Sequence, residues 1–131
     1  MNILIVDDNP INRKMLWEYL KGYGVCDMAG DGMEAVEQFE AELTTGHAYD
    51  LVLLDLMMPR MNGQNALRRI RAIERQYRIG SRDQAVVIIV TGAGSPEELL
   101  KTTDTDFKTG ILKKPVRLPE LTGMLKRHGL L

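Results

Sequence analysis

Short apolar runs alternate along the chain with longer segments in which apolar residues recur at helical spacing. The runs cover residues 3–6, 25–29, 51–54, 85–90 and 111–112. Because polar residues do not alternate within them, they are typical of strands buried on both faces of a parallel sheet. The alternation predicts an α/β fold, a doubly wound five-stranded parallel sheet with helices on both faces. A barrel of eight such units needs about 250 residues, so the open sheet fits this chain of 131 residues better.

The intervening segments have helical periodicity, and several of them carry a helix start signal. Asn9 before Pro10 predicts an N-cap followed by a proline at the first helical position, and Asp31 with Glu34 has the spacing of a capping box. The helices are predicted to start at or next to Asn9, Asp31, Gly63, Ser95 and Pro119. The residues expected to face inward are Ile11, Met15, Leu16, Leu20, Ala35, Val36, Phe39, Leu43, Ala66, Leu67, Ile70, Ile73, Leu121, Met124 and Leu125. Those expected to face solvent on the third helix are Arg68, Arg69, Arg71 and Arg75.

Composition and charge exclude several function classes. The length of 131 residues fits one domain. Seventeen basic and 18 acidic residues give a net charge of -1, which offers no electrostatic case for nucleic acid or an anionic membrane as partner. A single cysteine leaves no disulfide framework and no cysteine-based zinc site. Neither a signal peptide nor an apolar run of the ~18–20 residues of a membrane helix is present, so we expect a soluble, cytoplasmic protein.

Polar residues follow four of the five predicted strands directly. Asp7 and Asp8 follow the first run, Asp55 the third, Thr91 the fourth, and Lys114 comes after the fifth. Since the carboxyl ends of parallel strands meet at one edge of the sheet, where ligands bind in open α/β folds, we expect these side chains to converge. Each residue alone has an ordinary structural explanation, such as capping a helix, but their joint occurrence at one edge favours a functional site.

The expected cluster has the composition of a phosphoryl-transfer site. Three adjacent carboxylates repel one another unless a cation neutralises them. Oxygen ligands without histidine or cysteine suit Mg²⁺, which retains water and accepts a phosphate oxygen. Asp55 beside a divalent cation, the Lys114 ammonium and the Thr91 hydroxyl could attack phosphorus and form an aspartyl phosphate.

In these residues the chain resembles the receiver domain of two-component response regulators, the family of the chemotaxis regulator. The resemblance covers essentially the whole chain and rests on an ordered set of motifs: Asp7-Asp8, Asp55, Met58-Pro59, Met61-Asn62-Gly63, Thr91 and Lys114-Pro115. It implies a flavodoxin-like sheet with strand order 2-1-3-4-5. It also implies a single receiver domain over residues 1–131 without an output domain, although a receiver cut from a hybrid histidine kinase would look much the same.

The resemblance assigns a role to each residue of the site. Asp55 would accept a phosphoryl group from a phosphohistidine on a sensor histidine kinase or a histidine phosphotransfer protein. Asp7, Asp8, Asp55 and the backbone carbonyl of Met57 would bind Mg²⁺, while Thr91 and Lys114 would contact phosphoryl oxygens. The protein would then be a switch that phosphorylates and dephosphorylates itself, not an enzyme acting on a separate substrate. Its message would pass to a downstream protein through the fourth helix, fifth strand and fifth helix, or onward as phosphate in a relay.

One departure and two alternatives qualify the family expectation. Ile111 stands where chemotaxis-type receivers carry a switch aromatic, and it has no ring to move between solvent and core. A haloacid-dehalogenase-like phosphatase is disfavoured, because its Asp-x-Asp nucleophile follows the first strand, where this chain has Asp7-Asp8-Asn9. A pseudo-receiver that never takes phosphate is disfavoured by the presence of all five key side chains.

Overall fold

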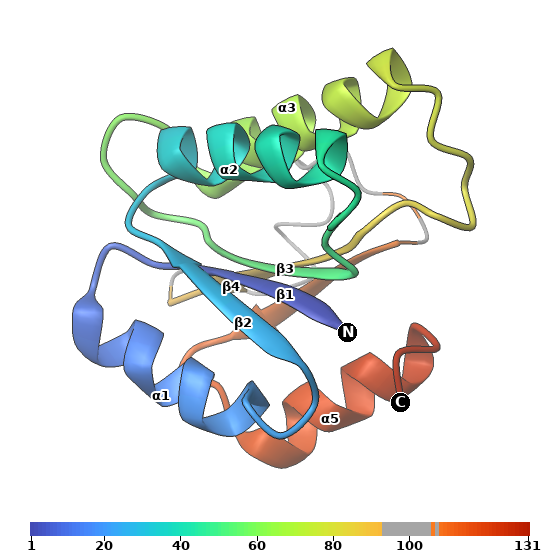
Figure 1. Ribbon diagram of the computed structural model, residues 1–131. Helices are drawn as coiled ribbons and strands as arrows, with labels where there is room; N and C mark the ends of the chain where they lie inside the picture. Colours follow the sequence, from blue (N-terminus) through green and yellow to red (C-terminus); the bar gives the residue numbers. More distant parts are fainter. Residues whose placement is uncertain (93–105, 107) are drawn as a thin grey trace.

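The computed structural model describes residues 1–92, 106 and 108–131 (Figure 1). In chain order the elements are β1 (Asn2–Val6), α1 (Pro10–Leu20), β2 (Val25–Ala29), α2 (Gly32–Thr44), β3 (Leu51–Asp55), α3 (Gly63–Gln76), β4 (Val86–Thr91), β5 (Thr109–Lys113) and α5 (Leu118–Arg127). The helix predicted to start at Ser95 lies outside the described residues.

The strands form one parallel sheet of five strands in the order β2-β1-β3-β4-β5. Helices α1 and α5 cover one face, and α2 and α3 cover the other (Figure 1). The doubly wound, flavodoxin-like prediction is therefore confirmed, including its strand order. The register places Val6 opposite Leu54, and Asp55 opposite Val90, so the ends of β1, β3 and β4 lie side by side.

Two apolar clusters, one on each face of the sheet, explain why the strand sequences do not alternate. Leu4 and Leu54 pack with residues of α2 and α3, whereas Ile3 and Leu53 pack with residues of α1 and α5. Because helices cover both faces, β3 and β4 are buried along their whole length. No helix in the described part of the chain is long and apolar enough to cross a bilayer.

Two of the predicted helix faces are wrong at single positions. Ile11 was expected to face inward but is 79% exposed. It lies five residues before Leu16, which is roughly 140° around a helix of 3.6 residues per turn, so the buried side of α1 turns away from it. Arg71 was expected to face solvent but is only 6% exposed. It follows Leu67 by one helical turn on the inward side of α3, and its charge is paired with the buried Glu74.

Candidate functional site

Three carboxylates converge at the carboxyl edge of the sheet. Asp7 follows β1 directly and Asp55 is the last residue of β3, and these two strands are neighbours. Carboxylate oxygens of Asp7, Asp8 and Asp55 all lie within 4.8 Å of one another. Asp7 and Asp55 are 2% and 6% exposed, whereas Asp8 is exposed. The group is therefore buried on one side and open to solvent on the other.

Lys114 brings a positive charge into this cluster. Its Nζ lies 3.0 Å from Oδ1 of Asp55 and 3.6 Å from Oδ2 of Asp7. The backbone N–H of Lys114 donates to the carbonyl oxygen of Thr91 at 2.7 Å, which continues the pairing of β4 with β5 beyond the last residue of β5. Thr91 itself is completely buried at the end of β4. The sheet thus holds the base of the Lys114 side chain beside the carboxylates.

The local electrostatics raise the pKa of both Asp55 and Lys114. Burial raises the pKa of Asp55, the hydrogen bond from Lys114 opposes that rise, and the neighbouring charges of Asp7 and Asp8 add to it. Burial alone would lower the pKa of Lys114, but its hydrogen bond to Asp55 and the charges of Asp55 and Asp7 outweigh burial, so its pKa is raised. The ammonium is consequently held in its charged form between carboxylates that need a cation.

The residues around Asp7 hold its backbone and side chain in place. The backbone N–H of Asn9 donates to Oδ1 of Asp7 at 2.9 Å, and Arg13 donates from its guanidinium to the Asp7 carbonyl oxygen at 2.6 Å. Asn9 also caps α1, because its side chain accepts from the N–H groups of Ile11 and Asn12. The cap predicted from sequence therefore positions the first carboxylates as well as starting a helix.

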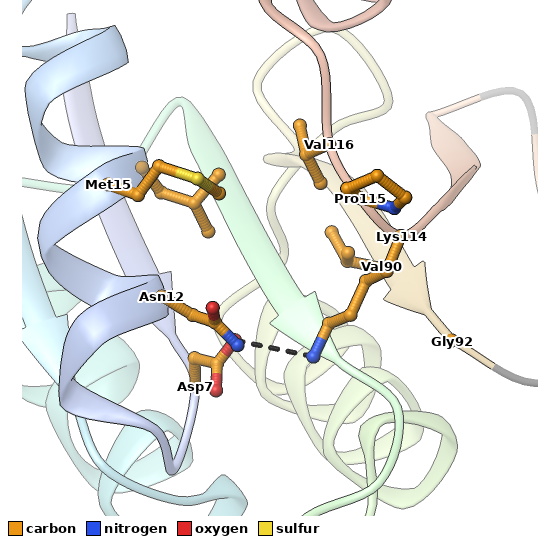
Figure 2. A pocket seen from close by; sticks show the side chains of 9 residues that line it. Asp7, Asn12, Met15, Val90, Gly92, Lys114, Pro115 and Val116 are labelled. Atoms are coloured by element: carbon orange, nitrogen blue, oxygen red, sulfur yellow. Dashed lines mark ion pairs between the residues drawn. The ribbon is translucent and has the colours of Figure 1, made fainter.

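Two adjoining pockets open at this edge. One is lined by all three carboxylates together with Asn9, Asn12, Met57, Gly92 and Lys114. The other, of about 380 Å³, lies between α1 and the segment after β5. Figure 2 shows Lys114 and Asp7 directed toward each other at this second pocket, with Met15, Val90 and Val116 around it. The acidic pocket is thus bordered by an apolar hollow.

The structure brings together most of the residues expected from sequence. Asp7, Asp8, Asp55, Met57 and Lys114 line the same pocket. Thr91 ends the adjoining strand β4, and the residue after it, Gly92, lines the pocket.

Asn12 was missed by the sequence analysis, although it lines both pockets. Its position one helical turn after the cap Asn9 is the signal that could have indicated it, because residues three apart share a helix face.

The donor set fits a hard divalent cation. It consists of carboxylate oxygens close enough for a shared ion, one of them on an exposed residue that leaves water access. Neither histidine nor cysteine belongs to the group, and oxygen donors with retained water are what Mg²⁺ prefers.

Ile111, at the family's aromatic position, is buried in the core cluster with residues of α2 and α3.

Comparison with known proteins gives consistent similarities. Residues 3–126 match the family model described as the response regulator receiver domain. The chain is 35% identical over 136 aligned residues to hybrid signal transduction histidine kinase B of Dictyostelium discoideum, an alignment that covers 96% of this chain and 6% of the kinase. Other curated relatives are covered over 7% to 15% of their length.

Two solved structures show the same architecture. One is the receiver domain of the Arabidopsis thaliana histidine kinase CKI1 complexed with Mg²⁺ and BeF₃⁻, at 26% identity and a TM-score of 0.78, covering 98% of this chain and 89% of that one. The other is the co-crystal structure of the Saccharomyces cerevisiae phosphotransfer protein Ypd1 with the receiver domain of Ssk1. Its match has 27% identity and a TM-score of 0.73, covering 96% of this chain and 86% of that one.

Proposed function

We propose that this chain, which belongs to the response regulator receiver family of two-component systems, accepts a phosphoryl group on Asp55. One observation carries the proposal. Asp55 ends a buried strand with two further carboxylates within 4.8 Å and the Lys114 ammonium 3.0 Å away. Phosphoryl transfer needs mainly positioning and charge stabilisation, and this arrangement supplies both.

In the proposed reaction an Asp55 carboxylate oxygen attacks phosphorus. A new O–P bond forms as the N–P bond of the donor phosphohistidine breaks, and the electron pair of that bond returns to the imidazole nitrogen. Lys114, now 3.0 Å from Asp55, would offset negative charge on a phosphoryl oxygen. The Thr91 hydroxyl, at the end of the next strand, would donate to another phosphoryl oxygen.

Asp7, Asp8 and Asp55, with the backbone carbonyl of Met57, are the proposed holders of Mg²⁺. Bound there, the ion would neutralise charge on the transferring phosphoryl group. Asp7 is held by Asn9 and Arg13 at distances of 2.9 and 2.6 Å, so its position does not depend on the ion. The Mg²⁺ complex of the related CKI1 receiver supports this assignment.

The proposed donor is a phosphohistidine on a sensor kinase or a histidine phosphotransfer protein. The co-crystal structure of Ypd1 with the related Ssk1 receiver supports a donor of this kind. For the downstream step we propose a protein partner bound through β5, α5 and the predicted helix after Ser95, or onward phosphate relay. The net charge of -1 supports a protein partner over nucleic acid or an anionic membrane.

We further propose that residues 1–131 work as one receiver unit and as a phosphoacceptor switch, not as an enzyme with a separate substrate. The chain spans 6% of the length of its Dictyostelium relative. What the longer relatives do as whole proteins is therefore no guide to the output of this one.

Intact-mass spectrometry tests the proposal. The chain is incubated with acetyl phosphate and Mg²⁺, beside Asp55→Asn and a matched Asp50→Asn variant. Asp50 immediately precedes β3, at the opposite end of the strand from Asp55. We expect one phosphate adduct that requires Mg²⁺, persists in Asp50→Asn and is absent from Asp55→Asn. An adduct that survives in Asp55→Asn would refute Asp55 as the acceptor, and the absence of an adduct on the wild-type chain would favour a pseudo-receiver.

A further inference from the structure

The loop 56–62, which joins the proposed acceptor strand to α3, is held at both ends by backbone hydrogen bonds. The N–H of Leu56 donates to the carbonyl oxygen of Val90 at 2.9 Å, and the N–H of Gly63 donates to the carbonyl oxygen of Leu56 at 2.8 Å. Between these ends Arg60 has a φ of 65°, in the left-handed region that residues with a side chain rarely occupy. Such a conformation persists only where surrounding contacts hold it.

Asp31 supplies a contact from another element. The Nε of Arg60 donates to Oδ2 of Asp31 at 3.0 Å, and its Nη2 forms an ion pair with the same oxygen. The other carboxylate oxygen of Asp31 accepts from the backbone N–H of Glu34 at 2.9 Å and so caps α2. Both oxygens are engaged, and the Asp31 side chain is only 15% exposed. The first turn of α2 therefore presents a fixed carboxylate to the loop.

The backbone of the loop also rests directly on this end of α2. A Cβ added to Gly32 would lie 2.5 Å from the carbonyl oxygen of Met61 and 3.0 Å from its Cβ. No side chain separates the two backbones at this point. Both Gly32 and Asp31 therefore support loop 56–62. Gly32 lets the backbone of the loop approach α2 closely, and the carboxylate of Asp31 pairs with Arg60.

We propose that Asp31 and Arg60 are positioning residues for phosphoryl acceptance. The inference rests on the proposed function of the site. Met57 belongs to this loop and lines the acidic pocket with Asp7, Asp8 and Asp55. By holding Arg60 in its left-handed conformation, Asp31 keeps Met57 beside the carboxylates and preorganises the site for Mg²⁺. Neither Asp31 nor Arg60 lines that pocket, so they act through the loop.

The Arg60 side chain is 62% exposed, and an ion pair of this kind contributes little to overall stability. Loss of the pair should therefore appear in Mg²⁺ affinity without an equivalent loss of folding stability. This separation distinguishes a positioning role from a merely structural one.

Two substitutions remove the ion pair while sparing the other roles of each residue. Asp31→Asn keeps an oxygen that caps α2, because Asn and Asp are equally good N-caps. Arg60→Gly permits the same left-handed backbone without steric cost, but without the contact to Asp31 the loop is no longer held in that conformation. Matched controls are Asp83→Asn, an exposed aspartate, and Arg78→Gly, which has a φ of 56° and follows α3 away from the site.

The test measures the Mg²⁺ dissociation constant of the full chain by isothermal titration calorimetry, with the urea midpoint of each variant measured in parallel. We expect Asp31→Asn and Arg60→Gly each to weaken Mg²⁺ binding by about 10-fold, the lower end for groups that orient metal ligands. The double variant should bind no more weakly than either single variant, because both remove one interaction. Arg60→Lys should retain most of the affinity, and both controls should match the wild type.

Unchanged Mg²⁺ affinity in Asp31→Asn and Arg60→Gly would overturn the inference. Losses of affinity that parallel a falling urea midpoint would also overturn it, as would a wild-type chain that binds no Mg²⁺. Failure of the proposed function looks different: a chain that binds Mg²⁺ with the expected dependence on Asp31 and Arg60, yet takes no phosphate on Asp55, would retain the positioning role and lose the acceptor role.

Discussion

The Lys114 ammonium lies 3.0 Å from Oδ1 of Asp55 and 3.6 Å from Oδ2 of Asp7, so one cation contacts two buried carboxylates at the ends of neighbouring strands. Burying a carboxylate without compensation is costly, and Lys114 supplies part of that compensation. Mg²⁺ at the proposed site would supply the rest. The ammonium and the metal ion would therefore neutralise the same carboxylates. Because a substitution of Lys114 removes only the ammonium, the two contributions can be measured separately.

Replacing Lys114 with methionine should slow phosphorylation of Asp55 without weakening Mg²⁺ binding. We expect the rate with acetyl phosphate to fall about 100-fold, the size of effect seen when one transition-state donor is removed. Mg²⁺ affinity should be equal or higher, because a competing cation is gone. Lys113→Met, an exposed lysine at the end of β5, should match the wild type in both measurements. A wild-type rate in Lys114→Met would contradict the proposed role.

Asp55→Asn should stabilise the fold at neutral pH in buffer without Mg²⁺. Burial raises the pKa of Asp55 above its ordinary value of 3.8, so between the two pKa values the folded protein binds more protons than the unfolded chain. Stability therefore falls as pH rises through the folded pKa. The gain in folding stability from Asp55→Asn should be complete above the folded-state pKa of Asp55 and should vanish below pH 3.8.

Urea unfolding as a function of pH measures this difference. Asp83→Asn, at an exposed site, is the control and should show no comparable gain. If the gain from Asp55→Asn stayed constant down to the lowest pH, the carboxyl charge would not be its cause.

Arg71→Met should destabilise the protein strongly. Arg71 Nη1 lies 2.8 Å from Glu74 Oε1 and donates to the carbonyl oxygen of Ala85 at 2.8 Å. Its Nε lies 3.1 Å from Oδ2 of Asp106, close enough for an ion pair but without hydrogen-bond geometry. Removing the guanidinium leaves the Glu74 charge buried, which costs about 3–5 kcal/mol.

Chemical denaturation of three variants checks the Arg71 prediction. Arg71→Met combined with Glu74→Gln should recover part of the loss, since the amide is neutral and its oxygen can still accept from the Ala85 N–H. Arg69→Met, on the exposed side of α3, should change stability by no more than about 0.5 kcal/mol. Equal effects of Arg71→Met and Arg69→Met would refute the importance of burial.

Gly63→Ala should disturb the acceptor strand. A Cβ at Gly63 would lie 2.7 Å from the carbonyl oxygen of Asp55 and 3.0 Å from Cα of Leu56, so the backbone must shift. We expect about 1–3 kcal/mol of destabilisation, the usual cost of overpacking, together with slower phosphorylation.

Gly123→Ala provides the opposite case for Gly63→Ala. Apart from the neighbouring residues and backbone of α5 itself, no part of the chain that the structure describes comes within 4 Å of a Cβ at this position, and the change should stabilise the helix by about 0.5–1 kcal/mol. Thermal unfolding of both variants gives the comparison, and a neutral or stabilising Gly63→Ala would contradict the close approach.

The sequence was enough to predict the sheet and which residues would lie at its carboxyl edge. Asp7 and Asp55 each come at the end of a buried strand, and parallel strands necessarily bring such ends together. Local signals also predicted two helix starts: Asn9 caps α1, and Asp31 caps α2. The capping box is only partly as predicted, because the Glu34 side chain accepts from Gly30 and not from Asp31.

Charge pairing could not be predicted in the same way. The arginines of α3 look alike in sequence, yet Arg71 is buried because Glu74, Ala85 and Lys108 offer acceptors around it. These acceptors come from separate segments of the chain, and no periodicity within one helix indicates them.

By itself the sequence determined which apolar runs form the strands and which polar residues follow them. The geometry of a parallel sheet then places those polar residues at one edge. The tertiary structure alone decided that Lys114 contacts two carboxylates and that Asp31 holds Arg60. These contacts join residues far apart in the chain, and their distances depend on how helices pack on the sheet. Packing is a property of the folded whole, which local sequence does not encode.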